Sequence, residues 1–139
     1  MKMRVFAIVV AMFGMIWATA VLAQDAEAAE IEATINGQME AFRAKDVDAA
    51  FEFASPMIQG MFGNSARFGT MVEQGFPTVW NNETVQYLEL SDLGPRWVQR
   101  VILRDGIGGF QMYDYMMVRM AEGWRIDGVA EVKAPDVGA

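Results

Sequence analysis

The chain has 139 residues, 53% of them hydrophobic, and a formal net charge of −7 at pH 7. It contains neither cysteine nor histidine, which excludes disulfides, Cys or His nucleophile–base pairs and the usual zinc and haem ligands. We therefore expect no metal and no cofactor, and any acid–base chemistry has to use Asp, Glu, Tyr, Lys or Arg.

Residues 1–23 have the three parts of a secretory signal peptide. Lys2 and Arg4 form a positive head. An uncharged apolar run follows, and Val21 and Ala23 give it the small-residue ending of a cleavage site. This pattern predicts a cleaved signal peptide and a periplasmic or secreted domain. An uncleaved anchor is the alternative, because the apolar run is close to the roughly 20 residues that span a bilayer as a helix.

The predicted mature part is residues 24–139, a length typical of a single domain. Lys2 and Arg4 leave with the signal and no acidic residue does, so 116 residues with nine basic and 18 acidic side chains remain, and the net charge becomes −9. We expect a domain this acidic to bind no nucleic acid and to contact a membrane only through an uncleaved signal anchor.

A long helix is predicted over residues 25–44, with Asp25 as its N-cap. Its apolar residues recur at steps of four, four and three, the spacing of one helix face. These residues are Ile31, Ile35, Met39 and Phe42.

Three shorter helices are predicted after it, over residues 47–54, 56–62 and 65–74. Asp46 and Ser55 are placed to cap the first two, and Pro56 is favoured at a first helical position. Asn64 or Ser65 opens the third. The stretch after Pro77 is expected to be irregular.

Four strands are predicted in the second half, over residues 84–90, 96–104, 110–120 and 124–132. The connections between them are short enough only for antiparallel neighbours. Helices followed by an antiparallel meander indicate an α+β fold in which the N-terminal helices pack on one face of a four-stranded sheet.

Three blocks of the sequence resemble a family of small exported bacterial domains of unknown function within the nuclear transport factor 2-like superfamily. They are Phe53-Ala54-Ser55-Pro56 through Gly75-Phe76-Pro77, then Val98-Gln99-Arg100-Val101, and the closing Gly123-Trp124-Arg125-Ile126-Asp127-Gly128-Val129. The resemblance implies a cystatin-like roll, in which a curved sheet wraps around a long first helix and leaves a conical pocket. It implies no particular activity.

Asp114 is the candidate base for acid–base chemistry. On a regular strand it interrupts an apolar face that carries three methionines, where desolvation would raise the pKa of its carboxyl group. Tyr113, Tyr115 or Tyr87 would then donate a hydrogen bond to a developing oxyanion, as in an isomerase or a dehydratase. The alternative, which we favour, is that Asp114 turns outward or pairs with an arginine.

Five arginines suggest an anion site. Arg96, Arg100 and Arg104 are spaced four residues apart, so a regular strand places them on one face. Arg119 and Arg125 lie on neighbouring strands, and such a set could bind a carboxylate or a phosphate. Ordinary cross-strand pairing is favoured instead, because the chain holds more acidic than basic side chains. The candidate partners are Glu83, Glu89, Asp127 and Glu131.

Aromatic side chains are candidates either for a ligand pocket or for the core. Trp80 is the least easily explained as a core residue, and the resembled fold implies a position near the pocket mouth. Together with Tyr87, Trp97 and Arg100 it makes up our candidate ligand-binding set.

The leading prediction is an exported, cofactor-free roll that binds a small ligand or a protein partner without catalysis. The first alternative is a small acid–base enzyme that uses Asp114 with a tyrosine, and the orientation of Asp114 discriminates between the two. A third hypothesis is an interaction domain that forms a homodimer through its sheet, which an apolar patch on the outer sheet face would favour.

Overall fold

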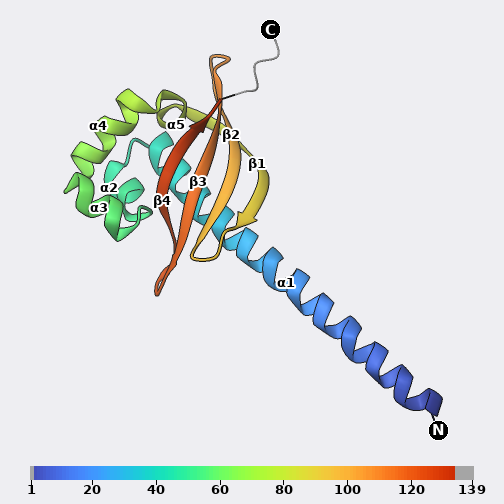
Figure 1. Ribbon diagram of the computed structural model, residues 1–139. Coiled ribbons are helices and arrows are strands. Elements are labelled where there is room, and N and C mark those ends of the chain that lie inside the picture. Colours follow the sequence, from blue (N-terminus) through green and yellow to red (C-terminus); the bar gives the residue numbers. More distant parts are fainter. Residues whose placement is uncertain (1, 134–139) are drawn as a thin grey trace. The chain divides into compact units, whose positions relative to one another are not determined.

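Five helices precede four strands in the computed structural model of the chain (Figure 1), which describes the backbone of residues 2–133 and the side chains of residues 23–133. The helices are α1 (Lys2–Arg43), α2 (Val47–Glu52), α3 (Pro56–Phe62), α4 (Ser65–Gly75) and α5 (Pro77–Trp80). The strands are β1 (Asn82–Asp92), β2 (Arg96–Asp105), β3 (Phe110–Met120) and β4 (Gly123–Val132). They form one antiparallel sheet in chain order. The predicted α+β class, with helices before a four-stranded antiparallel sheet, is confirmed.

The chain divides into two units, Met1–Glu30 and Ile31–Ala139, and the boundary lies within α1. Asp25 was wrongly predicted as an N-cap, because α1 continues on its N-terminal side. The predicted signal peptide, residues 1–23, lies almost entirely outside the residues whose side chains are described. Among the described residues, no helix is both long and apolar enough to cross a membrane. The sheet and helices α2–α5 belong to the second unit.

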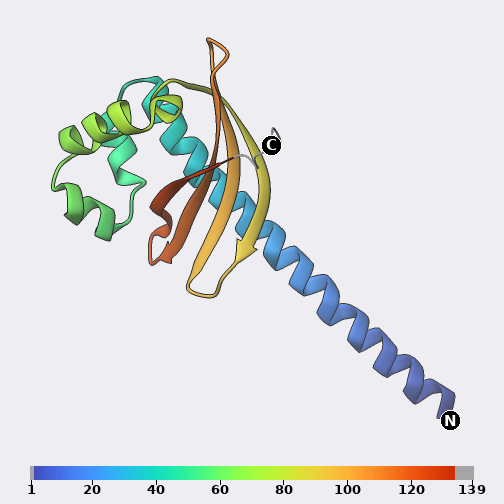
Figure 2. The same ribbon diagram turned by 45° about the horizontal axis from the view of Figure 1, so that its top comes forward.

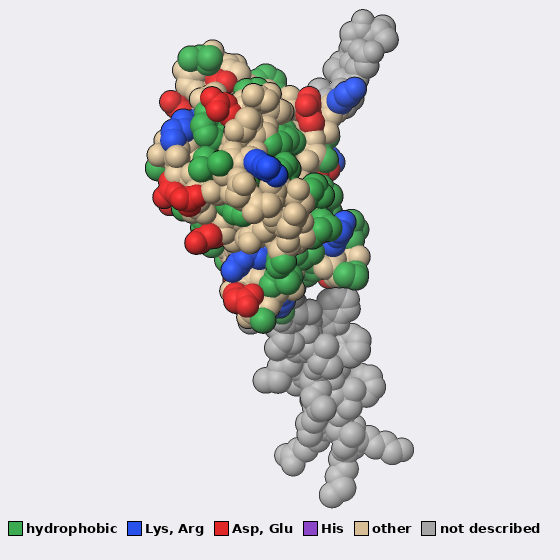
Figure 3. Space-filling view, turned by 90° about the vertical axis from the view of Figure 1, so that its left-hand side faces the viewer, with side chains coloured by type: hydrophobic (Ala, Val, Ile, Leu, Met, Phe, Trp, Pro, Cys, Tyr) green, Lys and Arg blue, Asp and Glu red, His purple; other side chains and the backbone are tan. Residues whose placement is uncertain are grey.

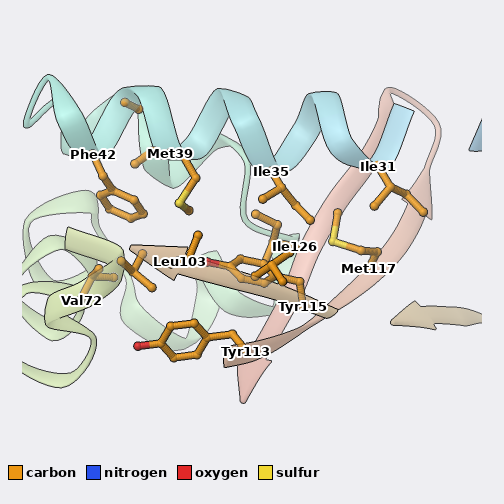
Figure 4. Packing of buried hydrophobic residues seen from close by; sticks show 14 of the residues in the cluster. Ile31, Ile35, Met39, Phe42, Val72, Leu103, Tyr113, Tyr115, Met117 and Ile126 are labelled. Atoms are coloured by element: carbon orange, nitrogen blue, oxygen red, sulfur yellow. The ribbon is translucent and has the colours of Figure 1, made fainter. Parts of the chain in front are cut away.

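Within the second unit, α1 places an apolar stripe on the sheet. Ile31, Ile35, Met39 and Phe42 are each at most 1% exposed. Figure 4 shows these four side chains pointing from the helix toward the sheet. The predicted core face of this helix is confirmed, and burial of such a stripe is the main source of stability for a helix of this kind.

One face of the sheet is turned toward the helices, and on β3 it is the face of the tyrosines. Tyr113, Tyr115 and Met117 are at most 3% exposed, whereas the residues that alternate with them are half-buried. Asp114 therefore belongs to the outer face. The expectation that Asp114 interrupts a buried apolar face was wrong, because both sides of β3 carry large hydrophobic side chains and the two-residue period alone does not say which side meets the core.

Local capping starts α2, α3 and α4. The side chains of Asp46, Ser55 and Asn64 each accept a hydrogen bond from the backbone N–H three residues later, at 3.1, 3.3 and 2.9 Å. These are the starts that the sequence predicts. Where an irregular stretch was expected, Pro77–Trp80 forms the short helix α5. Figure 2 shows α2–α5 grouped beside the C-terminal end of α1.

The connection between α2 and α3 pairs with the last strand. α2 ends earlier than predicted, and Ala54 forms a parallel bridge with Ile126 of β4. The Ser55 N–H donates to the Ile126 carbonyl at 2.8 Å, and the Ile126 N–H donates to the Phe53 carbonyl at 2.8 Å. These bonds anchor the small helices to the sheet, so that α3 and α4 stand over its inner face.

Candidate functional site

A cavity of about 250 Å³ lies between the helices and the inner face of the sheet. Its wall is built by side chains of α1, α3, α4, β3 and β4 and of the segment around α5. Two of these side chains are polar, Gln38 and Tyr115, and the others are apolar. Four phenylalanines contribute to the wall, namely Phe42, Phe62, Phe68 and Phe76.

α4 provides one side of the cavity because its apolar residues fall on a single helix face. Phe68 and Val72 are separated by one turn, are at most 5% exposed and both line the cavity. The Phe68 ring lies 6.0 Å from the ring of Phe42 on α1 and 5.8 Å from that of Phe62 on α3. This aromatic cluster joins three helices at the cavity and fixes their spacing.

α3 forms the outer, partly exposed wall of the cavity. Ile58, Met61 and Phe62 line the cavity, yet none of the seven described residues of α3 is fully buried, and Met61 is 67% exposed. The cavity therefore reaches the surface beside this helix. Figure 3 faces the side of the molecule that carries α2–α4, and hydrophobic side chains reach the surface there between charged ones.

Tyr115 is fully buried and lines the cavity. Its hydroxyl is the one buried side-chain polar atom among the described residues that has no hydrogen-bond partner. Burial, and to a lesser degree the nearby Tyr113 and Tyr87, raise the pKa of Tyr115 well above its usual value of 10. The hydroxyl is therefore neutral at physiological pH and can donate a hydrogen bond.

The other two tyrosine candidates have hydroxyl partners. The Tyr87 hydroxyl lies 2.6 Å from Asn36 Oδ1 and 3.1 Å from the carbonyl oxygen of Glu32, both on α1. The Tyr113 hydroxyl forms a hydrogen bond with the Thr78 side chain. Burial is the largest cause of a raised pKa in both. Neither residue lines the cavity, so Tyr115 is the tyrosine that the structure brings to it.

Asp114 lies on the outer sheet face in a bidentate pair with Arg100. The Arg100 Nε donates to Asp114 Oδ1 at 2.8 Å, and its Nη2 donates to Oδ2 at 3.1 Å. The Arg100 Nη1 also lies 3.0 Å from Oε1 of Glu89. The acid–base hypothesis needed an unpaired carboxylate in the cavity, and this pair removes Asp114 from that role.

The remaining arginines do not gather into one anion site. Arg96 Nη2 lies 2.8 Å from Asp127 Oδ2, a pairing that the sequence analysis favoured. Arg104 lies on the outer face, with its guanidinium over an aromatic ring. Arg119 is opposite Trp124 in the strand register, and its guanidinium carbon lies over the Trp124 ring at 5.6 Å, so it is on the inner side of the sheet. Among the described residues, no group of three or more acidic side chains is placed to hold a metal ion.

The aromatic ligand-binding candidates lie away from the cavity. The Trp80 ring packs 6.0 Å from Phe42 and beneath Lys45 Nζ at 4.4 Å, in a separate shallow hollow. The Trp97 ring packs edge-on against Trp124 at 5.7 Å. Neither they nor Tyr87 and Arg100 contribute to the cavity wall.

Most of the cavity wall was missed by the sequence analysis. Residues such as Phe42, Phe68 and Val72 have the spacing of core positions, and a side chain that borders a void has the same sequence pattern as one that fills it. Tyr115 is the exception, because it was one of the three tyrosines considered as hydrogen-bond donors.

Comparison with known proteins identifies the family. A family model described as a domain of unknown function (DUF4864) matches residues 24–139. No curated protein matches this sequence. The solution structure of a SEC-C motif containing protein from Rhodopseudomonas palustris is similar, with a TM-score of 0.55 and 22% identity over 81% of this chain and 86% of that chain. This likeness extends to the fold alone. Because the family model covers most of its length, the chain belongs to the DUF4864 family.

Proposed function

We propose that this domain binds a small, uncharged, apolar molecule in the cavity between the helices and the inner sheet face, without catalysing a reaction. The observation that carries this proposal is the apolar cavity of about 250 Å³. A cavity of roughly 150 Å³ lined by apolar side chains is enough to bind benzene. At the same volume per ligand atom, the cavity of this domain suits a ligand of roughly ten non-hydrogen atoms.

The wall selects against charged ligands. None of the described residues that line the cavity is acidic or basic. A carboxylate or a phosphate carried to its depth would lose its hydration without gaining an ionic partner, which is strongly unfavourable. A charged group of a ligand would have to remain in solvent beside Met61, where the cavity reaches the surface.

The ionisable groups in and near the cavity support a binding role more than a catalytic one. Tyr115 is the titratable residue of the wall, and its raised pKa keeps it protonated, so it cannot abstract a proton near pH 7. Asp114, the sequence-based candidate base, is paired with Arg100 on the opposite face. A cavity without a base supports a binding role better than an isomerase or a dehydratase.

We also propose that the fold is a cystatin-like roll of the nuclear transport factor 2-like superfamily and that residues 1–23 are a cleaved signal peptide. The proposal for the fold is supported by the cavity between the long helix and the sheet. The proposal for export is supported by the residue pattern of the segment and by a family match that starts at residue 24. The domain would then act in the periplasm or outside the cell.

The binding proposal is tested with naphthalene, an uncharged ligand of ten carbon atoms, by saturation-transfer NMR and calorimetry. Ile58→Trp places a larger side chain in the cavity wall. Met57→Trp is the control, because Met57 is the neighbouring residue, is 50% exposed and does not line the cavity. We expect the native chain and M57W to bind naphthalene and I58W to bind it at least about tenfold more weakly. Absence of binding to the native chain, or equal binding by a folded I58W, would contradict the proposal.

A further inference from the structure

In the described part of this domain, the buried side-chain polar atoms have hydrogen-bond partners, with one exception. The Gln38 Nε2 donates to the Ala50 carbonyl at 3.2 Å, and the Gln99 Nε2 donates to the Leu88 carbonyl at 3.0 Å. Within the described part of the chain, the Tyr115 hydroxyl is the exception. A buried hydroxyl without a partner destabilises a fold, and a phenylalanine would fill the same space without that cost. The hydroxyl therefore calls for an explanation beyond packing.

Tyr115 belongs to the cavity wall, and its hydroxyl end lies toward other residues of that wall. The residue lies on β3, one of the two central strands, between Gln99 of β2 and Val129 of β4 in the strand register. Figure 4 shows its ring beneath α1, with the hydroxyl end toward the side on which Phe42 and Val72 lie. Both of these residues line the cavity. Burial between the sheet and α1 holds the ring, so the hydroxyl has a fixed place beside these wall residues.

We propose that the Tyr115 hydroxyl is the recognition group of this cavity and donates a hydrogen bond to the carbonyl oxygen of a neutral apolar ketone. This inference rests on the proposed function, since it names the ligand class of the same cavity. The hydroxyl can donate or accept, and we assign the ligand an acceptor because unpaired buried donors are rarer in folded proteins than incompletely paired acceptors. A carboxylate is excluded, because none of the described residues in the wall is basic. The four phenylalanines favour an aromatic body for the ligand.

A pair of probes of the same shape isolates this hydrogen bond. Acetophenone carries a carbonyl oxygen, and α-methylstyrene carries a methylene group in its place. Their dissociation constants are measured by calorimetry for the native chain, for Tyr115→Phe and for the matched control Tyr113→Phe. Y113F removes a hydroxyl from the same strand and the same sheet face, but outside the cavity. Comparing the ratio of the two constants between proteins cancels the different hydration of the probes.

In the native chain and in Y113F we expect the preference for acetophenone over α-methylstyrene to be about tenfold greater than in Y115F. Most of this difference should come from a higher dissociation constant of acetophenone in Y115F. We also expect the Y115F variant to bind α-methylstyrene at least as well as the native chain. A ratio that is the same in all three proteins, while both probes bind, would overturn the role of Tyr115 and leave the binding function standing. If neither probe nor naphthalene binds, the proposed function fails as well.

Discussion

Asp127 connects the small helices to the sheet through its side chain. It is only 8% exposed, accepts a hydrogen bond from Ser55 Oγ at 2.7 Å and pairs with Arg96 at 2.8 Å. Ser55 also caps α3. One carboxylate thereby links β2, β4 and the start of the helix that covers the cavity.

Replacing Asp127 by alanine leaves the buried O–H donor of Ser55 without its acceptor, although the oxygen still accepts from the Ile58 N–H. We expect D127A to lower the free energy of unfolding by about 1–3 kcal/mol, mostly from this hydrogen bond. Arg96 is half exposed, so its ion pair adds little. Urea unfolding measures the change, and Glu131→Ala, an exposed carboxylate on the same strand, is the control, expected within about 0.5 kcal/mol of the native chain. Equal losses in both variants would contradict this prediction.

The raised pKa of Tyr115 predicts a dependence of stability on alkaline pH. Its pKa is higher in the folded state than the usual value of 10, so the unfolded state releases this proton first as the pH rises. The stabilisation is complete below pH 10 and is lost progressively above it, by up to about 1.4 kcal/mol per pH unit. In urea unfolding at pH 8, 10 and 11, we expect Y115F to lose less stability than the native chain. Parallel losses in the two proteins would show that Tyr115 does not contribute.

At the scale of elements, Gly37 illustrates how packing overrides helix propensity. A glycine inside a helix is unfavourable by about 1 kcal/mol relative to alanine. A Cβ at Gly37 of α1 would, however, lie 2.5 Å from Cζ of Phe53, which packs against the core from the segment after α2. The glycine allows that segment to approach the long helix.

Gly37→Ala is therefore expected to destabilise the domain by about 1–3 kcal/mol despite its better helix propensity. Gly60 on α3 is the matched control, because a Cβ there meets no atom within 4 Å. Gly60→Ala should stabilise the domain by up to about 1 kcal/mol. Thermal and urea unfolding of both variants provide the comparison, and a stabilising G37A would show that Phe53 moves aside at little cost.

At the scale of the whole molecule, the homodimer predicted from the sequence would form through the outer face of the sheet. Its apolar residues Val98, Ile102, Met112 and Met116 are half-buried and surround the pair formed by Arg100 with Asp114. We expect native mass spectrometry of the protein to give the mass of two chains. A mass of one chain at high protein concentration would contradict it.

The elements themselves were largely predictable because their signals are local. Asp46, Ser55 and Asn64 cap helices within three residues of themselves, and the turns between the strands are short. The site was less predictable. Tyr115 was among the candidates, but only its burial without a partner separates it from Tyr87 and Tyr113, and that depends on what the neighbouring elements offer.

The sequence by itself determined the α+β class, the order of the elements and the absence of cysteine and histidine chemistry, because these follow from composition and from contacts between residues close in the chain. The tertiary structure alone decided which face of β3 meets α1, and with it that Asp114 pairs with Arg100 while Tyr115 faces the cavity. Both faces of that strand carry large hydrophobic side chains, so the choice depends on its packing against residues far away in the sequence. The cavity has the same origin, since a void is a property of how several elements meet and not of any one of them.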